Sequence, residues 1–153
     1  YERELFIPRL SLSAPMPIVE VPLRNRTWDV RDLGQNIGFL EGTTWVSEAD
    51  TETGGNTVLA GHIQIDIGVP GPFRDLNQIQ IGDSIFLAEQ GTIYEFRVFN
   101  ILTVAPNDVE VAYPTSEPTL TLITCTTWNE YRGVFDERFV VQAHPVRQLT
   151  YNS

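Results

Sequence analysis

The stretch Thr119-Leu-Thr-Leu-Ile-Thr-Cys125 carries the alternation of side chains that decides the fold of this chain. Successive side chains of an extended strand point to opposite faces, so Leu120 and Leu122 share one face and Cys125 lies on the other. We expect the two leucines to face a core. Cys125 then ends the strand on the opposite face, before the polar loop 126–133, where a thiol can meet solvent and a ligand.

A second strand after that loop repeats the alternation and adds a positive charge. In Arg138-Phe-Val-Val-Gln-Ala143, the inward positions are apolar and Arg138 falls on the far face. If the two strands pair across the loop, Arg138 lies beside Cys125, where a guanidinium can stabilise an oxyanion or orient a carbonyl. The alternative for Arg138 is a surface ion pair with Asp136 or Glu137.

Short β-rich runs recur along the whole chain and are separated by 11 glycines and 10 prolines. They cover residues 17–21, 57–60, 84–88, 92–104, 119–125 and 139–143. No long segment repeats apolar residues with the helical period, so we predict an all-β, mostly antiparallel sheet that closes into a barrel. Two short helical turns are expected, around residues 28–33 and at 72–76. No composition shift divides the chain, so residues 1–153 are expected to form a single domain.

Composition excludes several classes of protein. The formal net charge is -10 at pH 7, and this negative field repels a phosphate backbone, so no nucleic-acid partner is expected. No run of about 18 apolar residues occurs, and residues 1–5 lack the pattern of a secretion signal. Because the chain opens on Tyr1 and not on Met, we expect it to be a piece of a longer protein whose upstream part can hold a membrane span or a secretion signal.

The two histidines differ in their surroundings. In Asn56-Thr-Val-Leu-Ala-Gly-His62, the histidine follows an apolar strand through a glycine, which is typical of a side chain presented at a barrel rim. His144 precedes Pro145 near the end of the chain and is expected to be solvated. We therefore favour His62 as the acid/base partner of Cys125. On its own, a single cysteine is more often a buried hydrophobic residue than a nucleophile.

Several stretches together resemble the sortases, bacterial cysteine transpeptidases that attach proteins to the cell envelope. Thr121-Leu-Ile-Thr-Cys125 is similar to the TLxTC signature of that family. Further similar stretches are residues 56–62, 73–76, 81–83, 117–119 and 138–141, in the family's order of histidine, cysteine and arginine. The resemblance covers most of the chain and implies a closed, sortase-like β-barrel of about eight strands with one or two short helices.

The resemblance also implies a reaction and its residues. Cys125 would cleave an LPxTG-like sorting motif after its threonine and form a thioester acyl-enzyme, which an amine of the cell envelope resolves. His62 would act as general acid and base, and Arg138 would hold the substrate and its developing negative oxygen. The family places such an enzyme on the extracellular face of the bacterial cytoplasmic membrane. Its partners would be the sorting-motif peptides of secreted proteins and an envelope amine.

The expected substrate-binding residues flank the cysteine. Thr124 precedes it, and Thr126, Thr127 and Trp128 follow it in the polar loop. With Tyr131, these loop residues are candidates for shielding the thioester from water, and Trp128 is favoured for its large apolar face. The alternative is that they are ordinary exposed loop residues.

Neither a pilus-polymerising class nor a metal is favoured. The lid of that class carries an Asp-Pro-aromatic motif, which nothing before His62 matches, so anchoring of single proteins is preferred. The acidic row Glu48, Asp50 and Glu52 offers the oxygen ligands that calcium prefers, but it lacks the twelve-residue loop of a specific site, so a solvated loop is the better interpretation. We expect no cofactor.

Two other functions are compatible with the sequence. A thiol hydrolase with Cys125, His62 and Arg138 would release the acid and give no ligated product. A non-enzymatic β-barrel binding module would instead bury Cys125 and make it slow to alkylate.

Overall fold

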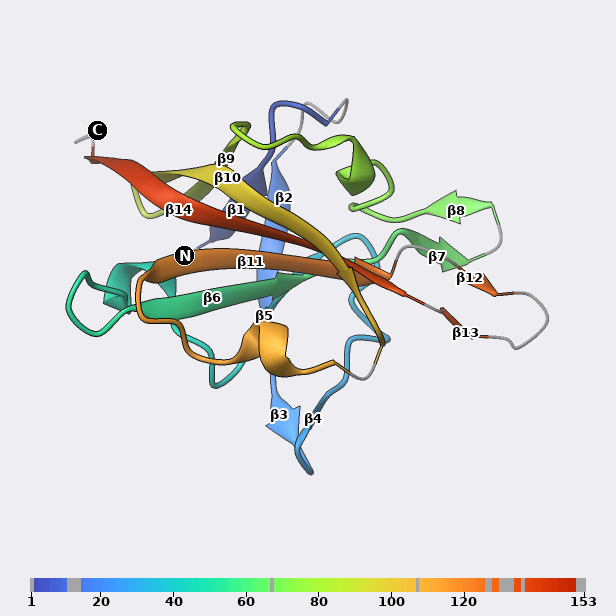
Figure 1. The fold of residues 1–153 in the computed structure, drawn as a ribbon. Coiled ribbons are helices and arrows are strands. Elements are labelled where there is room, and N and C mark those ends of the chain that lie inside the picture. The colour runs from blue at the N-terminus through green and yellow to red at the C-terminus, as the bar shows by residue number, and fades with distance from the viewer. Residues whose placement is uncertain are drawn as a thin grey trace.

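Strands make up most of the chain, and eight of them close into a barrel (Figure 1). The computed structural model describes residues 2–10, 15–66, 68–106, 108–125, 128–129, 134–135 and 137–150, with the backbone alone at residues 125, 128, 129, 134 and 135. In this part of the chain, no helix is long and apolar enough to cross a membrane.

The barrel strands follow one another in the order β1, β2, β5, β6, β11, β14, β10 and β9. Neighbouring strands are antiparallel, except that β2 runs parallel to β5 and β6 runs parallel to β11. The strand bounds are β1 Arg3–Phe6, β2 Met16–Val21, β5 Ile37–Leu40, β6 Gly55–Ala60, β9 Ser84–Glu89, β10 Thr92–Val104, β11 Pro118–Cys125 and β14 Arg138–Thr150.

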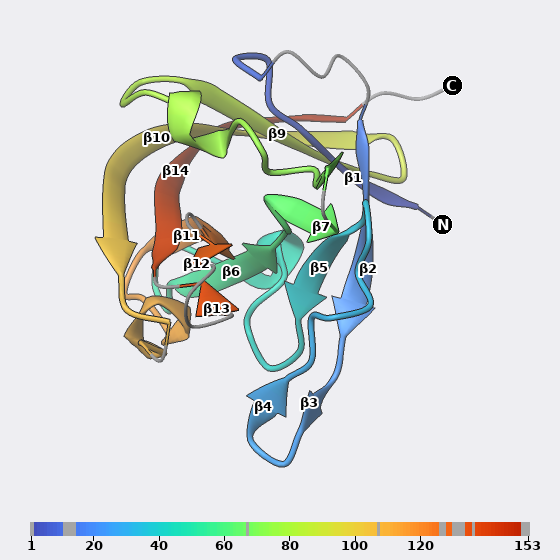
Figure 2. The same cartoon turned by 90° about the vertical axis from the view of Figure 1, so that its right-hand side faces the viewer.

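Three small hairpins and three short 3-10 turns complete the described fold. The hairpins are β3 (Leu23–Arg24) with β4 (Thr27–Trp28), β7 (Gln64–Asp66) with β8 (Val69–Pro70), and β12 (Trp128–Asn129) with β13 (Val134–Phe135). The 3-10 turns are η1 (Val46–Glu48), η2 (Leu76–Gln78) and η3 (Glu110–Ala112). The β7–β8 and β12–β13 hairpins project from the same end of the barrel in Figure 1. The β3–β4 hairpin also projects outward from the barrel, at the bottom of Figure 2.

The sequence-based strand predictions are confirmed, and one of the two helical predictions is wrong. Each of the six predicted runs forms a barrel strand, and β1 and β5 complete the closure. Around residues 28–33 the chain forms β4 and then turns, because the Asp29 carboxylate accepts the backbone N–H of Arg31 and so competes with helical hydrogen bonding. At 72–76 a turn leads into η2, which begins at Leu76.

The inward face of the strands forms the main core, as the alternation predicts. Leu120 and Leu122 are fully buried inside the barrel, where they pack with Val141 and Ala143, and Phe139 packs against this core. The register of β11 and β14 places Leu120 opposite Ala143 and Leu122 opposite Val141. These pairs fix which face of each strand turns inward.

A second apolar cluster covers the outer face of the same strands, which the sequence does not predict. Its buried members are Val21, Leu33, Leu40, Val58, Ala60, Ile123 and Val140. The segments around β4 and η3 pack against it through Trp28, Val30, Val111 and Ala112, and the end of β10 does so through Leu102 and Val104. Strand β6 is buried along its whole length because it has apolar neighbours on both faces.

Asn56 ties the η3 segment to the barrel. Its side-chain amide donates hydrogen bonds to the carbonyls of Val111 (2.9 Å) and Tyr113 (3.0 Å), and its oxygen accepts one from the hydroxyl of Thr121 (2.7 Å). Asn56 is 2% exposed and Thr121 is fully buried, so each polar group has the partner that burial demands. This network holds the η3 segment against the outer side of β6 and β11.

Candidate functional site

Three neighbouring barrel strands end or begin at one place and bring the predicted site residues together. Cys125, the last residue of β11, pairs with Arg138, the first residue of β14. On the other side of β11, Ile123 lies opposite Ala60 at the end of β6, and the Gly61 N–H donates to the carbonyl of Ile123 (3.2 Å). The predicted pairing across the loop is therefore confirmed at the level of the backbone. Since β6 and β11 are parallel, the next residues of the β6 segment, ending in His62, run alongside Cys125.

The His62 ring is anchored by a backbone carbonyl. Its Nε2 lies 2.7 Å from the carbonyl oxygen of Val30, in the turn that follows β4. A carbonyl can only accept, so Nε2 carries the proton, and in the neutral ring Nδ1 is the basic nitrogen. The ring is half-buried, with its tautomer and direction fixed by this contact.

The backbone of His62 is held as tightly as its ring. Its carbonyl accepts the N–H of Phe73 (3.0 Å), and Gly71 N–H donates to the carbonyl of Ile63 (2.7 Å). A Cβ on residue 71 would lie 2.1 Å from the His62 oxygen, so this close approach requires glycine. Phe73 is 1% exposed and anchors the segment in the barrel core.

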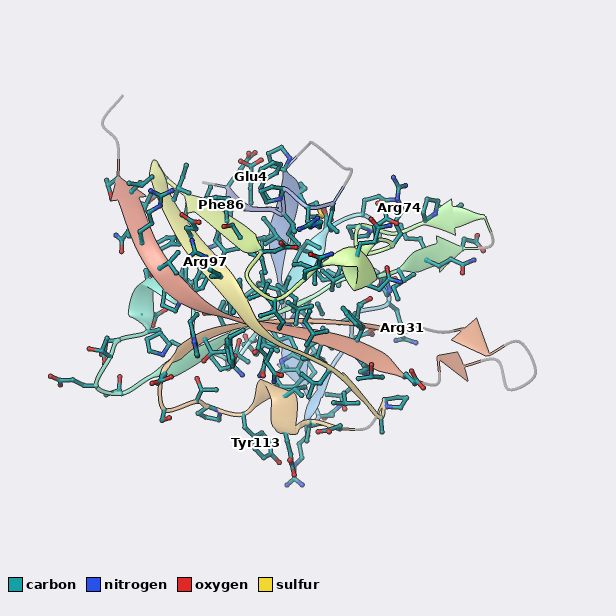
Figure 3. All side chains as sticks on the ribbon, turned by 45° about the horizontal axis from the view of Figure 1, so that its top comes forward. Glu4, Arg31, Arg74, Phe86, Arg97 and Tyr113 are labelled. Atoms are coloured by element: carbon teal, nitrogen blue, oxygen red, sulfur yellow. The ribbon has the colours of Figure 1, made fainter. Side chains whose placement is uncertain are left out.

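The turn that holds the Val30 carbonyl is itself stabilised by an ion pair. The Asp29 carboxylate accepts the backbone N–H of Arg31 (3.1 Å) and two guanidinium hydrogen bonds, at 2.9 and 2.7 Å. The hydrogen bonds from the Arg31 side chain lower the pKa of Asp29 to about 2. Both side chains are largely exposed, so the contribution of this pair to stability is small, but its geometry orients the peptide that carries the Val30 carbonyl. Figure 3 shows Arg31 toward the end of the molecule that carries the β7–β8 and β12–β13 hairpins.

Arg138 is anchored in the same manner from the opposite side. Its Nε donates to the carbonyl of Pro106 (2.9 Å), in the segment between β10 and η3. A guanidinium has five N–H donors, so one such bond sets its direction without exhausting its capacity. Of the alternative ion-pair partners, Asp136 lies outside the described residues.

A cleft of about 230 Å³ lies between the two segments that supply these carbonyls. Leu40, Ala60 and Ile123 form its apolar floor, and Arg138 also lines it. One wall is residues 26–28 and Val30, and the other is Pro106, Asp108, Val109, Val111 and Ala112. Figure 1 shows η3 and the β3–β4 hairpin on the same side of the sheet.

Three larger hollows lie away from the converging strand ends. Their volumes are about 710 Å³ along residues 22–32, about 660 Å³ beside residues 8–9 and 82–86, and about 440 Å³ near the opposite ends of β6 and β11. None of the three is lined by Ala60, Ile123 or Arg138. The smaller cleft is therefore the candidate site, because it alone of these hollows adjoins the converging strand ends.

The predicted substrate-binding residues are placed only in part. Thr124 is 3% exposed and therefore has little surface to offer a peptide. Thr126, Thr127 and Tyr131 lie outside the described residues, and Trp128 is described only as backbone in β12. Their contacts with substrate stay predictions.

His144 lies far from this cleft. It is not in an irregular C-terminal segment but within strand β14. Strand β14 continues through it to Thr150, and its ring stacks on Phe99 with centroids 3.7 Å apart. It lies six residue steps along β14 from Arg138, a distance of about 20 Å. Its Nε2 lies 3.6 Å from the Glu117 carboxylate, at a partly exposed position.

The acidic row forms a turn in the structure. Asp50 accepts the backbone N–H groups of Glu52 (2.8 Å) and Thr53 (2.7 Å), and these hydrogen bonds lower its pKa. Within the residues that the structure describes, no three His, Cys, Asp or Glu side chains are grouped closely enough to hold a metal ion. The expectation of no cofactor stays a prediction.

Sequence reasoning missed the two carbonyls that anchor the site. Val30 and Pro106 act through the main chain, which every residue possesses, so no side-chain pattern marks them. It also missed Arg26 and Trp28 as part of the cleft wall. The sequence gives only a weak hairpin signal there, because Asn25 is followed by Arg26 and not by the glycine that is typical of such a turn.

Comparison with known proteins assigns most of the chain to one type of domain. A family model described as "Sortase domain" matches residues 5–146. Sortase A of Bacillus anthracis is 34% identical over 116 residues, which are 76% of this chain and 51% of that protein. Sortase A of Listeria monocytogenes is 31% identical over 87 residues, 57% of this chain and 38% of that protein. This chain thus spans about half the length of the first of these relatives, and less of the second.

Solved structures of two kinds of sortase are similar to the barrel. Sortase A from Corynebacterium diphtheriae has a TM-score of 0.75 and 27% identity, covering 99% of this chain and 63% of that one. Sortase C-1 from Actinomyces oris has a TM-score of 0.73 and 27% identity, covering 95% of this chain and 73% of that one. The two scores are nearly equal, so the fold does not decide the subfamily.

Proposed function

Because this chain belongs to the sortase family, we propose that it is a cysteine transpeptidase that cleaves an LPxTG-like sorting motif and transfers the acyl fragment to an amine of the cell envelope. The observation that carries the proposal is the register of β6, β11 and β14. It brings the chain at His62, Cys125 and Arg138 to one end of three adjacent strands, beside an apolar cleft.

The proposed reaction has two acyl-transfer steps. The Cys125 thiolate adds to the carbonyl carbon of the motif threonine, and breaking the C–N bond leaves a thioester. The departing amine takes a proton from the His62 imidazolium. An incoming amine then attacks the thioester, gives a proton to His62 and displaces the thiolate. Arg138 places its positive charge near the oxygen that becomes negative in both steps.

The anchoring of His62 selects the nitrogen that does this work. Nε2 is engaged with the Val30 carbonyl in both protonation states, because it carries a proton in each. Nδ1 is then the nitrogen that gives and takes the proton. The Val30 carbonyl positions the ring and also stabilises the imidazolium that forms when the incoming amine is deprotonated.

The cleft suits the apolar part of such a motif. Leu40, Ala60 and Ile123 offer an aliphatic floor for leucine and proline side chains. The chain's net charge of -10 favours a cationic amine as the second substrate and disfavours nucleic acid. We place the domain on the extracellular face of the bacterial cytoplasmic membrane, acting on sorting motifs of secreted proteins without a cofactor.

Mass spectrometry of the protein mixed with sorting-motif peptides tests the proposal. We expect an acyl adduct on Cys125 that disappears when a glycine-based amine is added and is replaced by a ligated peptide. Cys125→Ala should give no adduct, and His62→Gln should slow its formation by about 10²- to 10⁴-fold, the usual contribution of general acid–base catalysis.

Two outcomes would contradict the proposal. Release of the free acid with no ligated product at saturating amine identifies a thiol hydrolase. No adduct with any of a broad set of peptides, together with slow alkylation of Cys125 by iodoacetamide, identifies a binding module.

A further inference from the structure

We propose that Arg26 determines substrate specificity by selecting an acidic side chain in the peptide that occupies the cleft. This inference rests on the proposed function, since it concerns the peptide that the same cleft would bind. In the proposed reaction the acyl fragment, on the amino-terminal side of the cleaved bond, is the part of the peptide that stays bound to Cys125, so the acidic residue is assigned to that side.

Arg26 sits in a backbone conformation that favours glycine. The β3–β4 hairpin pairs Arg24 with Thr27, so Asn25 and Arg26 form a two-residue turn. Their φ angles are 51° and 63°, the left-handed values of a type I′ turn, for which Asn-Gly is the preferred sequence. An arginine at the second position is sterically disfavoured in this turn, and residues in such strained conformations are often functional, so we ask what the Arg26 side chain does.

The hairpin is fixed so that its turn borders the cleft. The indole N–H of Trp28 donates to the carbonyl of Glu41 (2.8 Å), and the Leu23 N–H donates to the Glu41 carboxylate (3.0 Å). Trp28 also packs against the outer apolar cluster. Arg26, Thr27 and Trp28 all line the cleft, so the guanidinium of Arg26 is carried on an anchored wall.

Arg26 differs from most of the arginines that the structure describes in having no described carboxylate partner within 4.0 Å. Among the described residues, ion pairs within 4.0 Å engage Arg3, Arg9, Arg31, Arg74, Arg97 and Arg147, but not Arg26. The one carboxylate in the facing wall is Asp108, and its Oδ1 accepts the N–H of Glu110 (2.9 Å) at the start of η3. Arg26 is thus available to a carboxylate supplied by a ligand.

The cleft is positive although the molecule is negative. Its described lining carries two arginines and one aspartate, in a chain of net charge -10. Arg138 is already bonded to the Pro106 carbonyl and lies beside the reacting cysteine. Arg26 is the cleft cation that remains for a substrate side chain, and its planar fork matches a carboxylate.

Peptides that differ in one charge test this assignment. A sorting-motif series with Glu, Gln or Lys at the variable position of LPxTG, or at one of the positions before the motif leucine, is assayed for kcat/KM at low salt. At one of these positions, we expect kcat/KM for the Glu peptide to exceed that for the Lys peptide by about tenfold, which is the effect of one partly desolvated ion pair. Arg26→Gln should reduce that preference below about twofold.

Two further variants separate charge from folding. Arg26→Gly fits the left-handed turn and should lose the preference in the same way, without loss of thermal stability. Arg24→Gln is the matched control, because Arg24 lies on the same hairpin but does not line the cleft. This variant should keep the full preference for the Glu peptide.

Binding to Cys125→Ala protein separates this inference from the proposed reaction. Fluorescence anisotropy of labelled Glu and Lys peptides measures the preference without turnover, with and without Arg26→Gln. A preference in binding that Arg26→Gln removes supports the assignment, even if wild-type protein forms no thioester. No charge preference in either assay, or a preference that survives Arg26→Gln, overturns it.

Discussion

Replacing Gly71 by alanine tests whether the segment after the β7–β8 hairpin fixes His62. The added Cβ would lie 2.1 Å from the His62 oxygen and 2.6 Å from its carbonyl carbon. Both are backbone atoms, so no side-chain rotation relieves the overlap. The two segments must separate until the contact is at least 3.0 Å, which strains the hydrogen bonds Gly71 N–H to Ile63 and Phe73 N–H to His62.

The size of the effect follows from these contacts. Overpacking costs about 1–3 kcal/mol, and each of the two weakened hydrogen bonds adds up to about 1 kcal/mol, so the free energy of unfolding should fall by about 1–5 kcal/mol. At about 2–4 °C per kcal/mol for a domain of this size, Tm should fall by about 2–20 °C. A shift of about 1 Å in an acid/base residue lowers kcat/KM by about 100-fold. Thermal melting and acyl-enzyme formation below the new Tm measure the two effects separately.

Gly54→Ala supplies the control, because its Cβ would lie 2.0 Å from the carbonyl oxygen of Thr115, next to the opposite end of β6. It should lower Tm at least as much as Gly71→Ala but keep kcat/KM within about twofold in the folded protein. If Gly54→Ala does not fold, Gly68→Ala takes its place, since Gly68 has φ of +73° and open space around it. Folded Gly71→Ala with wild-type kcat/KM would refute the argument that Gly71 positions His62.

Two further predictions concern the same site. In ¹⁵N-histidine NMR spectra above pH 8, we expect His62 to carry its proton on Nε2, because the 2.7 Å contact with the Val30 carbonyl requires a donor there. The His144→Gln variant assigns the two histidine signals. A proton on Nδ1 would contradict the proposed role of Nδ1 in proton transfer. The pKa of Asp29 is about 2 instead of 3.8, so folding favours its carboxylate, and the resulting stability is complete above pH 3.8 and lost as pH falls through about 2. Asp29→Asn should therefore show a shallower decrease of Tm than wild type between pH 4 and 2 at low salt, and identical curves would show that the Arg31 pair contributes nothing to folding.

The strands that the sequence predicts are those with a full alternation or a long apolar run. Strand β5, Ile37-Gly-Phe-Leu40, was missed because it is short, contains glycine and is buried at every position. Its stability comes from pairing with β2 on one side and β6 on the other, and more than ten residues of chain separate it from each partner. Tertiary pairing of this kind leaves no local signal.

The same limit applies to the outer face of β11. Alternation correctly assigns Leu120 and Leu122 to the core, but it treats the opposite face as open to solvent. Thr121 and Ile123 are buried there because the β4 and η3 segments fold back over them. Thr121 also hydrogen-bonds to Asn56, which lies more than 50 residues away in the sequence. Such a contact forms only when the barrel closes, so the spacing of residues along the chain does not predict it.

The predicted pairing of the strand ends at Cys125 and Arg138 is confirmed in the backbone register, because two antiparallel strands joined by one loop pair at the ends next to that loop. The hydrogen bonds that hold His62 and Arg138 could not be predicted, because their acceptors are backbone carbonyls. The Val30 carbonyl that holds His62 and the Pro106 carbonyl that holds Arg138 belong to opposite walls of one cleft. A ligand that moves either wall therefore moves an anchored side chain with it, so peptide binding and catalytic geometry cannot vary independently in this barrel.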